Sequence, residues 1–260
     1  MIRACDVTKH FENFKALSGL SMHVRKGTIY GLIGPNGAGK TTIINHLNGV
    51  MKPEKGSITI DGNEVYENES TKQKILNIAD DWFYYAGYNV KQMAYFYKDV
   101  YPLFSTERYE KLKGIFKIDE KKQIRKMSKG QKKQVAFWLS LSAMPDVLIL
   151  DEPLDGLDPV MRKQVLNLVI ADVADREMTV LVSSHNLREL EDICDWVGII
   201  YNGEIIIEKP LDDLKSSVCK YQVSFKEDVE DKLKSLEGLL NFSKTGSVYN
   251  IIISGDTDKA

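Results

Sequence analysis

The chain has 260 residues, 43% of them hydrophobic, which is enough to bury one large core or a core with a small appendage and argues against a natively disordered chain. The 35 Lys and Arg residues nearly balance the 37 Asp and Glu residues, so the net charge of −2 gives no overall attraction for nucleic acid or anionic lipid. Because Cys5, Cys194 and Cys219 form no CxxC pair, and no stretch approaches the roughly 20 apolar residues that span a bilayer, we expect a cytoplasmic protein.

The beginning of the chain predicts an antiparallel β portion. Apolar segments alternate there with turn sequences at residues 25–27 and 61–62. The segments are residues 2–7, 20–24 and 57–60.

Further short apolar runs are separated by longer helical patterns. Wholly apolar strands between helices are typical of an α/β domain with a mainly parallel central sheet. The runs are residues 28–33, 147–150, 179–183 and 197–201.

Residues 80–133 have a different, helical and aromatic-rich pattern, which predicts a helical subdomain. Its aromatic side chains are expected to form the core of this subdomain, with a surface that docks a partner as the alternative. They are Trp82, Phe83, Tyr84, Tyr85, Tyr88, Tyr95, Phe96, Tyr97, Tyr101, Phe104 and Tyr109.

The end of the chain predicts a small separate extension. We expect a main domain over residues 1–215 and an appended βαββ unit over residues 216–260. Its expected helix lies near residues 229–236, and its expected hairpin lies at residues 239–254.

A glycine-rich loop follows the apolar run at residues 28–33 and leads into a helical pattern. Glycine backbone N–H groups can surround a phosphate in this context, and the helix N-terminus adds a favourable dipole. The loop has the Walker A pattern, so we expect Lys40 to reach the β- and γ-phosphates of ATP and Thr41 to bind Mg²⁺. The predicted ATP-binding residues here are Gly34, Pro35, Asn36, Gly37, Ala38, Gly39, Lys40, Thr41 and Thr42.

Two carboxylates, Asp151 and Glu152, follow directly on the apolar run at residues 147–150. Carboxylates at the end of a buried strand are costly unless they face a cation or a reacting group. Asp151 fits a residue that supports Mg²⁺, and Glu152 fits a catalytic residue that polarises the attacking water. The alternative is an acidic helix cap, which the following Pro153 disfavours.

The order of these motifs, together with three further ones, resembles that of the ABC ATPase family. Residues 127–131, Met-Ser-Lys-Gly-Gln, resemble the family signature LSGGQ and stand just before the strand that ends at Asp151. Residues 155–158 resemble the D-loop, and residues 183–185 resemble the segment with the switch histidine. The resemblance covers residues 1 to about 209 and implies the P-loop NTPase fold of this family, with ATP and Mg²⁺ as its ligands.

The resemblance also implies a head-to-tail dimer, in which the Walker A loop of one subunit and the signature of the other bind the same ATP. The partner would be a second copy or a different ATPase subunit. His185 would contact the γ-phosphate as a second catalytic residue beside Glu152, and Phe11 has the position of an aromatic that stacks on adenine. The residues implied to act across the interface are Ser128, Lys129, Gly130, Gln131 and Asp158. Taken alone, Ser128 fits an ordinary helix N-cap equally well.

Two positions depart from the family pattern. Lys129 stands where the signature has its first glycine, and we expect activity to survive this change. Asp80 stands where the family has the glutamine of the Q-loop. Because a carboxylate oxygen suits Mg²⁺, Asp80 is predicted as a magnesium ligand with Thr41 and Asp151, although Asp80 and Asp81 could also cap a helix.

The resemblance therefore implies the ATP-binding and ATP-hydrolysing subunit of an ABC transporter. It would power a separate transmembrane permease from the inner face of the cell membrane, and its subgroup looks like bacterial exporters of antibiotics, peptides or lipids. The alternative is a soluble ABC ATPase that acts on ribosomes or DNA. The single motif set, the balanced charge and the missing heptad run disfavour this alternative, so no direct contact with nucleic acid is expected.

Overall fold

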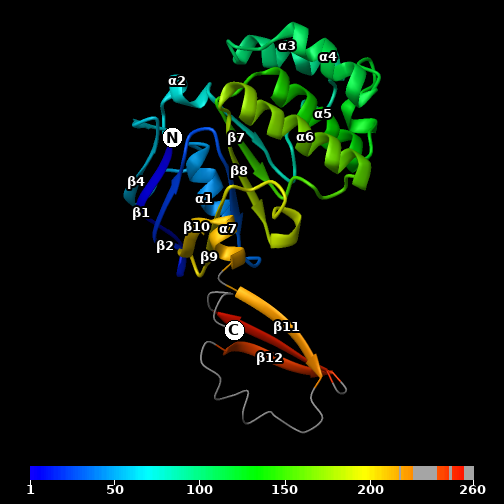
Figure 1. Ribbon diagram of the computed structural model, residues 1–260. Coiled ribbons are helices and arrows are strands. Elements are labelled where there is room, and N and C mark those ends of the chain that lie inside the picture. Colours follow the sequence, from blue (N-terminus) through cyan, green and yellow to red (C-terminus); the bar gives the residue numbers. More distant parts are fainter. Residues whose placement is uncertain (217, 225–238, 246–247, 255–260) are drawn as a thin grey trace. The chain divides into compact units, whose positions relative to one another are not determined.

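The computed structural model describes residues 1–216, 218–224, 239–245 and 248–254 (Figure 1). The chain divides into two compact units, Met1–Glu208 and Lys209–Ala260. This division lies before the boundary expected at residues 215 and 216.

The first unit begins with a four-stranded antiparallel sheet in the order β2-β1-β4-β5. Side chains at the end of β2 alternate between buried and exposed, as expected for a strand with one face on the core. The strands are β1 (Ile2–Phe11), β2 (Phe14–Val24), β4 (Lys55–Ile60) and β5 (Asn63–Glu64). They include all three strands that the sequence predicts in this region.

A six-stranded sheet in the order β10-β9-β3-β8-β7-β6 forms the centre of the unit. Parallel pairing joins β9 to β3, β3 to β8, β8 to β7 and β7 to β6. Every residue of β3, β7 and β8 is buried, which explains their apolar sequences. The strands are β3 (Ile29–Ile33), β6 (Ile75–Ile78), β7 (Val147–Asp151), β8 (Thr179–Ser184), β9 (Trp196–Tyr201) and β10 (Glu204–Pro210).

Helix α1 (Lys40–Leu47) lies between the two sheets, as Figure 1 shows. Ile43, Ile44 and Leu47 are buried on this helix and belong to one core with side chains from both sheets. The start of α1 is therefore fixed at the ends of the central strands.

The α-helices that follow α1 in this unit begin at polar caps. Asn89, Ser105, Ser128 and Asp158 each accept a hydrogen bond from a backbone N–H in the first turn that follows. No helix in the described ranges is long and apolar enough to cross a membrane. The helical segments are α2 (Glu69–Lys72), α3 (Val90–Val100), α4 (Thr106–Phe116), η1 (Ile124–Lys126), α5 (Lys129–Ser142), α6 (Pro159–Arg176) and η2 (Leu187–Glu189).

The aromatic side chains of the helical subdomain divide between its core and its surface. Trp138 on α5 is fully buried, stacks on Tyr109 with ring centroids 4.7 Å apart and donates from Nε1 to the Tyr109 carbonyl. Phe83, by contrast, is 67% exposed, and Tyr85, Tyr88 and Tyr95 are also exposed. The predicted core is therefore present, and a docking role for the exposed group stays a prediction.

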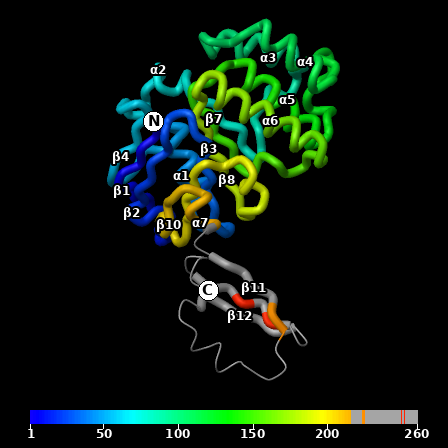
Figure 2. The backbone as a smooth tube through the Cα atoms, in the orientation of Figure 1, coloured from blue at the N-terminus to red at the C-terminus, as the bar shows by residue number. Residues whose placement is uncertain are grey.

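The second unit contains a three-stranded antiparallel sheet in the order β11-β13-β12. A short helix, α7 (Leu211–Ser216), precedes it. Its strands are β11 (Val218–Ser224), β12 (Leu239–Thr245) and β13 (Val248–Ser254). Figure 2 traces the backbone of the helix, α7, that precedes them. The helix expected near residues 229–236 lies outside the described residues.

Candidate nucleotide site

The loop between β3 and α1 has a backbone that requires glycine at its end. Gly39, the N-cap of α1, has a φ of 109°, a conformation that side chains disfavour. A Cβ at this position would also lie 2.8 Å from the carbonyl oxygen of Ala16. The glycine therefore lets the loop turn tightly into the helix, with the first N–H groups of α1 directed into the loop.

A cavity of about 330 Å³ lies over this loop. It brings together residues from β2, the loop, α1, the segment after β6 and the end of β7. The lining residues are Phe14, Ala16, Asn36, Gly37, Gly39, Lys40, Thr41, Thr42, Asp80, Asp151 and Glu152.

Lys40 is buried at this cavity. Its Nζ donates to the carbonyl oxygens of Gly34 and Pro35, at 2.8 and 3.3 Å, and lies 3.7 Å from Glu152 Oε1. Loop carbonyls and a carboxylate thus hold the ammonium group in place, beside the N-terminus of α1. This arrangement concentrates positive charge where a phosphate would bind.

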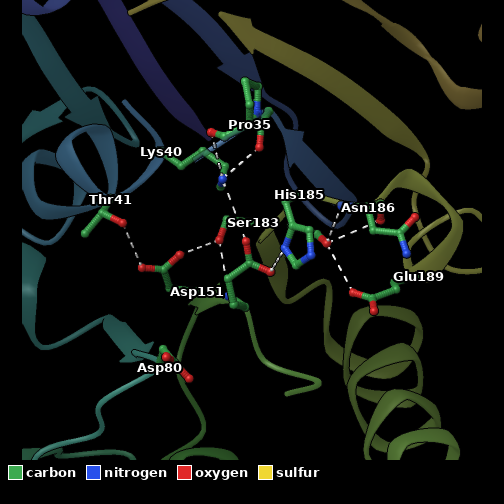
Figure 3. A network of polar contacts seen from close by, with 12 residues as sticks. Pro35, Lys40, Thr41, Asp80, Asp151, Ser183, His185, Asn186 and Glu189 are labelled. Carbon is green, nitrogen blue, oxygen red and sulfur yellow. Dashed lines mark hydrogen bonds and ion pairs between the residues drawn. The ribbon is translucent and has the colours of Figure 1, made fainter. Parts of the chain in front are cut away.

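Asp151 is buried at the end of β7 and holds two hydroxyl groups (Figure 3). Its Oδ2 accepts from Thr41 Oγ1 at 3.3 Å, and its Oδ1 accepts from Ser183 Oγ at 2.5 Å. The Thr41 hydroxyl and the Asp151 carboxylate supply oxygen ligands at the cavity, which is the chemistry that Mg²⁺ prefers. No helix begins here, so the alternative of an acidic helix cap at Asp151 and Glu152 is wrong.

Glu152 extends from the carboxyl end of β7 toward Lys40 and His185. While Oε1 faces the Lys40 ammonium, Oε2 lies 3.1 Å from His185 Nδ1. The backbone φ of Glu152 is 45°, in the left-handed region that residues with a side chain rarely adopt. A carboxylate is thus held between two nitrogen groups beside the cavity.

Asp80 lines the same cavity, but its carboxylate is also paired with the signature segment. Lys129 Nζ lies 3.0 Å from Asp80 Oδ1, and Lys133 Nζ lies 3.7 Å from the same oxygen. The hydrogen bond from Lys129 lowers the pKa of Asp80. The two departures from the family pattern therefore contact each other, and neither Asp80 nor Asp81 caps a helix, since α3 begins after Asn89.

The signature segment lies apart from the lining of this cavity. Ser128 and Gln131 form a capping box at the start of α5, so the N-cap expected for Ser128 is present. Gly130 packs against the D-loop, where a Cβ would lie 2.5 Å from the Gly156 carbonyl oxygen. Asp158 caps α6. These residues and Lys129 do not line the cavity of their own chain, and their role across an interface stays a prediction.

Phe11 and Phe14 face each other across the turn between β1 and β2. Phe14 lines the cavity, whereas Phe11 does not and is 42% exposed, with Lys9 Nζ 5.6 Å from its ring centroid. The adenine-stacking role predicted for Phe11 thus has a second candidate three residues further along.

Sequence reasoning missed Ser183 and Lys133 as site residues. The Ser183 hydroxyl accepts from the Glu152 N–H at 3.2 Å while it donates to Asp151, and Lys133 Nζ lies 3.4 Å from the Glu152 carbonyl oxygen. Ser183 belongs to the segment with the switch histidine, which the sequence does show. Lys133 lies in a polar part of a helix, and no sequence motif marks it.

Known proteins share both the sequence and the fold of this chain. The family described as "ABC transporter" matches residues 17–155. The ABC transporter ATP-binding protein YtrB of Bacillus subtilis is 32% identical over 253 residues, which cover 97% of this chain and 86% of YtrB. The bacitracin transport ATP-binding protein BcrA of Bacillus licheniformis is 34% identical over 224 residues, with coverage of 85% and 73%.

A solved structure described as the ATP binding subunit of an ABC transporter has a TM-score of 0.77 and 27% identity. It is similar over 83% of this chain and 92% of its own length. ATP-binding subunits of this family dimerise and act with transmembrane components. The chain therefore belongs to the ABC transporter family, as an ATP-binding subunit with ATPase activity.

Proposed function

We propose that the cavity over the loop of residues 34–39 is the site where this subunit binds and hydrolyses ATP. The observation that carries the proposal is the convergence of Lys40, Thr41, Asp151 and Glu152 on one cavity, although β3 and β7 are far apart in sequence. Lys40 and the N-terminus of α1 would hold the β- and γ-phosphates, because their charge and dipole favour anions.

Thr41 and Asp151 would hold Mg²⁺, with Asp80 as the further predicted ligand on the same cavity. When bound, the ion would neutralise negative charge on the phosphates. Ser183 keeps the Asp151 carboxylate in one orientation through its short hydrogen bond.

Glu152 would polarise the water that attacks the γ-phosphorus. Its carboxylate is oriented by Lys40 on one side and by His185 on the other, which fits a base fixed in one direction. His185 would then contact the γ-phosphate as well. Closure of the site needs Ser128, Lys129, Gly130, Gln131 and Asp158 of a second ATPase subunit.

The replacement Glu152→Gln tests this assignment. Turnover is expected to fall by roughly 100-fold or more, since the amide cannot accept the proton of water, while ATP binding persists and an ATP-bound dimer accumulates in light scattering. Glu107→Gln, which removes an exposed carboxylate from the first turn of α4, is the matched control and should leave turnover unchanged. Wild-type turnover in Glu152→Gln would remove Glu152 from this role.

The permease would dock in a groove beside the free edge of β6. This groove has a volume of about 390 Å³ and is lined by apolar side chains from α3, β6 and the segment between them, including Trp82, Phe83 and Phe96. The buried amide atoms of Asn48 and the Oδ1 atom of Asn77, which also line it, find no hydrogen-bond partner in the described part of the chain. An apolar groove suits a helix of a membrane subunit.

The transported substrate would be a peptide-like or lipid-like antibiotic, moved out of the cell. The similarity to a relative named as a bacitracin transport protein supports this proposal. Expression of the chain with its permease in a sensitive bacterium is expected to raise the bacitracin concentration that stops growth, and the Glu152→Gln form is not. Equal sensitivity with and without the wild-type pair would contradict the substrate assignment.

A further inference from the structure

The peptide of Glu152 is held in an unfavourable conformation by contacts on both sides. A residue with a Cβ at a φ of 45° costs on the order of 1–3 kcal/mol and persists only where the surrounding structure imposes it. The Glu152 N–H donates to Ser183 Oγ at 3.2 Å. On the other side, the Glu152 carbonyl oxygen accepts from Lys133 Nζ at 3.4 Å.

Lys133 is an unusual residue for this position. It lies in the second turn of α5 and is only 3% exposed, so burial lowers the pKa of its ammonium group. Its Nζ also lies 3.5 Å from the Ala79 carbonyl oxygen and 3.7 Å from Asp80 Oδ1. A buried ammonium group costs stability, and an apolar side chain of the same length would fill the space at lower cost.

We propose that Lys133 is a positioning residue, which fixes the left-handed peptide of Glu152 and thereby aims the carboxylate of Glu152 at the attacking water. This inference rests on the catalytic role proposed for Glu152. Lys133 itself does not line the nucleotide cavity, and it would act on Glu152 through the backbone carbonyl of that residue.

The same ammonium group contacts the segment after β6 through Ala79 and Asp80. It therefore connects three parts of the chain: the signature helix α5, the segment that leads from β6 toward the proposed permease groove, and the catalytic peptide. A displacement of α5 relative to the central sheet would shift the Glu152 carbonyl and change the direction of its carboxylate.

Replacement of Lys133 by Met tests the proposal, because Met keeps the length of the side chain but has no charge and no donor. The full chain carrying Lys133→Met is expected to lose roughly ten- to hundredfold in kcat, since a small displacement of a catalytic group has an effect of this size. Its KM and its affinity for ATP are expected to stay within about twofold of the unchanged chain, because the substitution removes no residue that lines the nucleotide cavity. Its Tm is expected to be equal or higher.

Hydrogen–deuterium exchange gives a readout that does not depend on turnover. The amides of Glu152 and Leu154, which flank Pro153, are expected to exchange faster in Lys133→Met than in the unchanged chain, with no nucleotide present. Lys132→Met is the matched control: Lys132 is the neighbouring lysine on α5, and its Nζ lies 5.1 Å from the Tyr84 ring centroid. This control should change neither kcat nor the exchange of these amides.

The double variant Glu152→Gln with Lys133→Met separates the inference from the function on which it rests. If Lys133 acts through Glu152, the double variant hydrolyses ATP as slowly as Glu152→Gln alone. Wild-type kcat in Lys133→Met, with a slow Glu152→Gln, would overturn the role of Lys133 and leave the proposed site intact. A kcat loss in Lys133→Met matched by equal losses of Tm and ATP affinity would overturn it too.

Wild-type turnover in Glu152→Gln would instead contradict the catalytic role proposed for Glu152, on which this inference rests. Lys133→Leu repeats the experiment with a second apolar side chain in case Lys133→Met does not fold, and the same outcomes apply to it.

Discussion

At the scale of single residues, the site depends on hydroxyl groups as much as on charges. Ser183 shows this most clearly, because one buried Oγ serves both acidic residues at the end of β7. It donates to the Asp151 carboxylate and accepts from the Glu152 N–H. A group that satisfies two partners at once fixes their relative orientation.

Removal of this hydroxyl by Ser183→Ala is expected to lower kcat by roughly tenfold, which corresponds to about 1.4 kcal/mol for the lost buried hydrogen bonds. Steady-state ATPase assays at saturating Mg-ATP measure the effect. Ser184→Ala is the control on the same strand, since Ser184 Oγ contacts Asn186 and Glu189 instead. Equal losses in the two variants would contradict the special role of Ser183.

At the scale of elements, an exposed ion pair joins the segment after β6 to the start of α5. The Asp80 and Lys129 side chains are each more than half exposed, so water and salt screen their attraction. The pair therefore contributes little to stability. Its effect is to hold the segment after β6 beside the start of α5. Asp80 and Lys129 both depart from the family pattern, and they carry opposite charges that pair with each other.

A double-mutant cycle with Asp80→Asn and Lys129→Met is expected to give a coupling free energy of roughly 0.2–1 kcal/mol at pH 7, measured by urea unfolding. Because the hydrogen bond from Lys129 lowers the pKa of Asp80 in the folded chain, the coupling is present above the ordinary pKa of 3.8 and is lost as the pH falls below it. It should also weaken in 1 M salt. A coupling that neither acid nor salt reduces would rule out an ionic origin.

At the scale of the whole molecule, the first unit has two separate cavities, each with a proposed function. One is the nucleotide cavity, and the other is the aromatic groove beside β6. Asp80 and Asp81 are neighbours in sequence but line different cavities, the first at the nucleotide and the second at the groove. A short segment thus connects the proposed ATP site to the proposed permease site.

Phe83→Ala is expected to reduce copurification of the membrane subunit several-fold, because it removes an exposed aromatic anchor from the groove. The ATP affinity of the purified chain should stay unchanged. Tyr95→Ala, which removes an exposed aromatic on α3 that does not line the groove, is the control. Quantitative mass spectrometry of the copurified proteins measures both, and unchanged recovery in Phe83→Ala would argue against this docking surface.

The α/β class and the nucleotide loop could be predicted from the sequence because each depends on neighbouring residues, whereas the ABC fold was implied by the resemblance of the ordered motifs. The apolar strands were recognised from their composition, and the loop from Gly34 to Thr41 from its glycine spacing. Contacts between distant segments could not be predicted in the same way. Lys133 meets Glu152 only because α5 packs near the end of β7, and Asp80 meets Lys129 for a similar reason. Such contacts leave no local pattern in the chain.

The left-handed conformation of Glu152 has an evolutionary consequence, given the catalytic role proposed for this residue. Glycine and asparagine adopt this conformation more readily than glutamate does, whereas β-branched residues do not. A change of Glu152 to glycine or asparagine would therefore silence hydrolysis while it relieves backbone strain. One substitution would thus give a stable but inactive copy of this subunit. A dimer of that copy with an active subunit would have a single hydrolytic site.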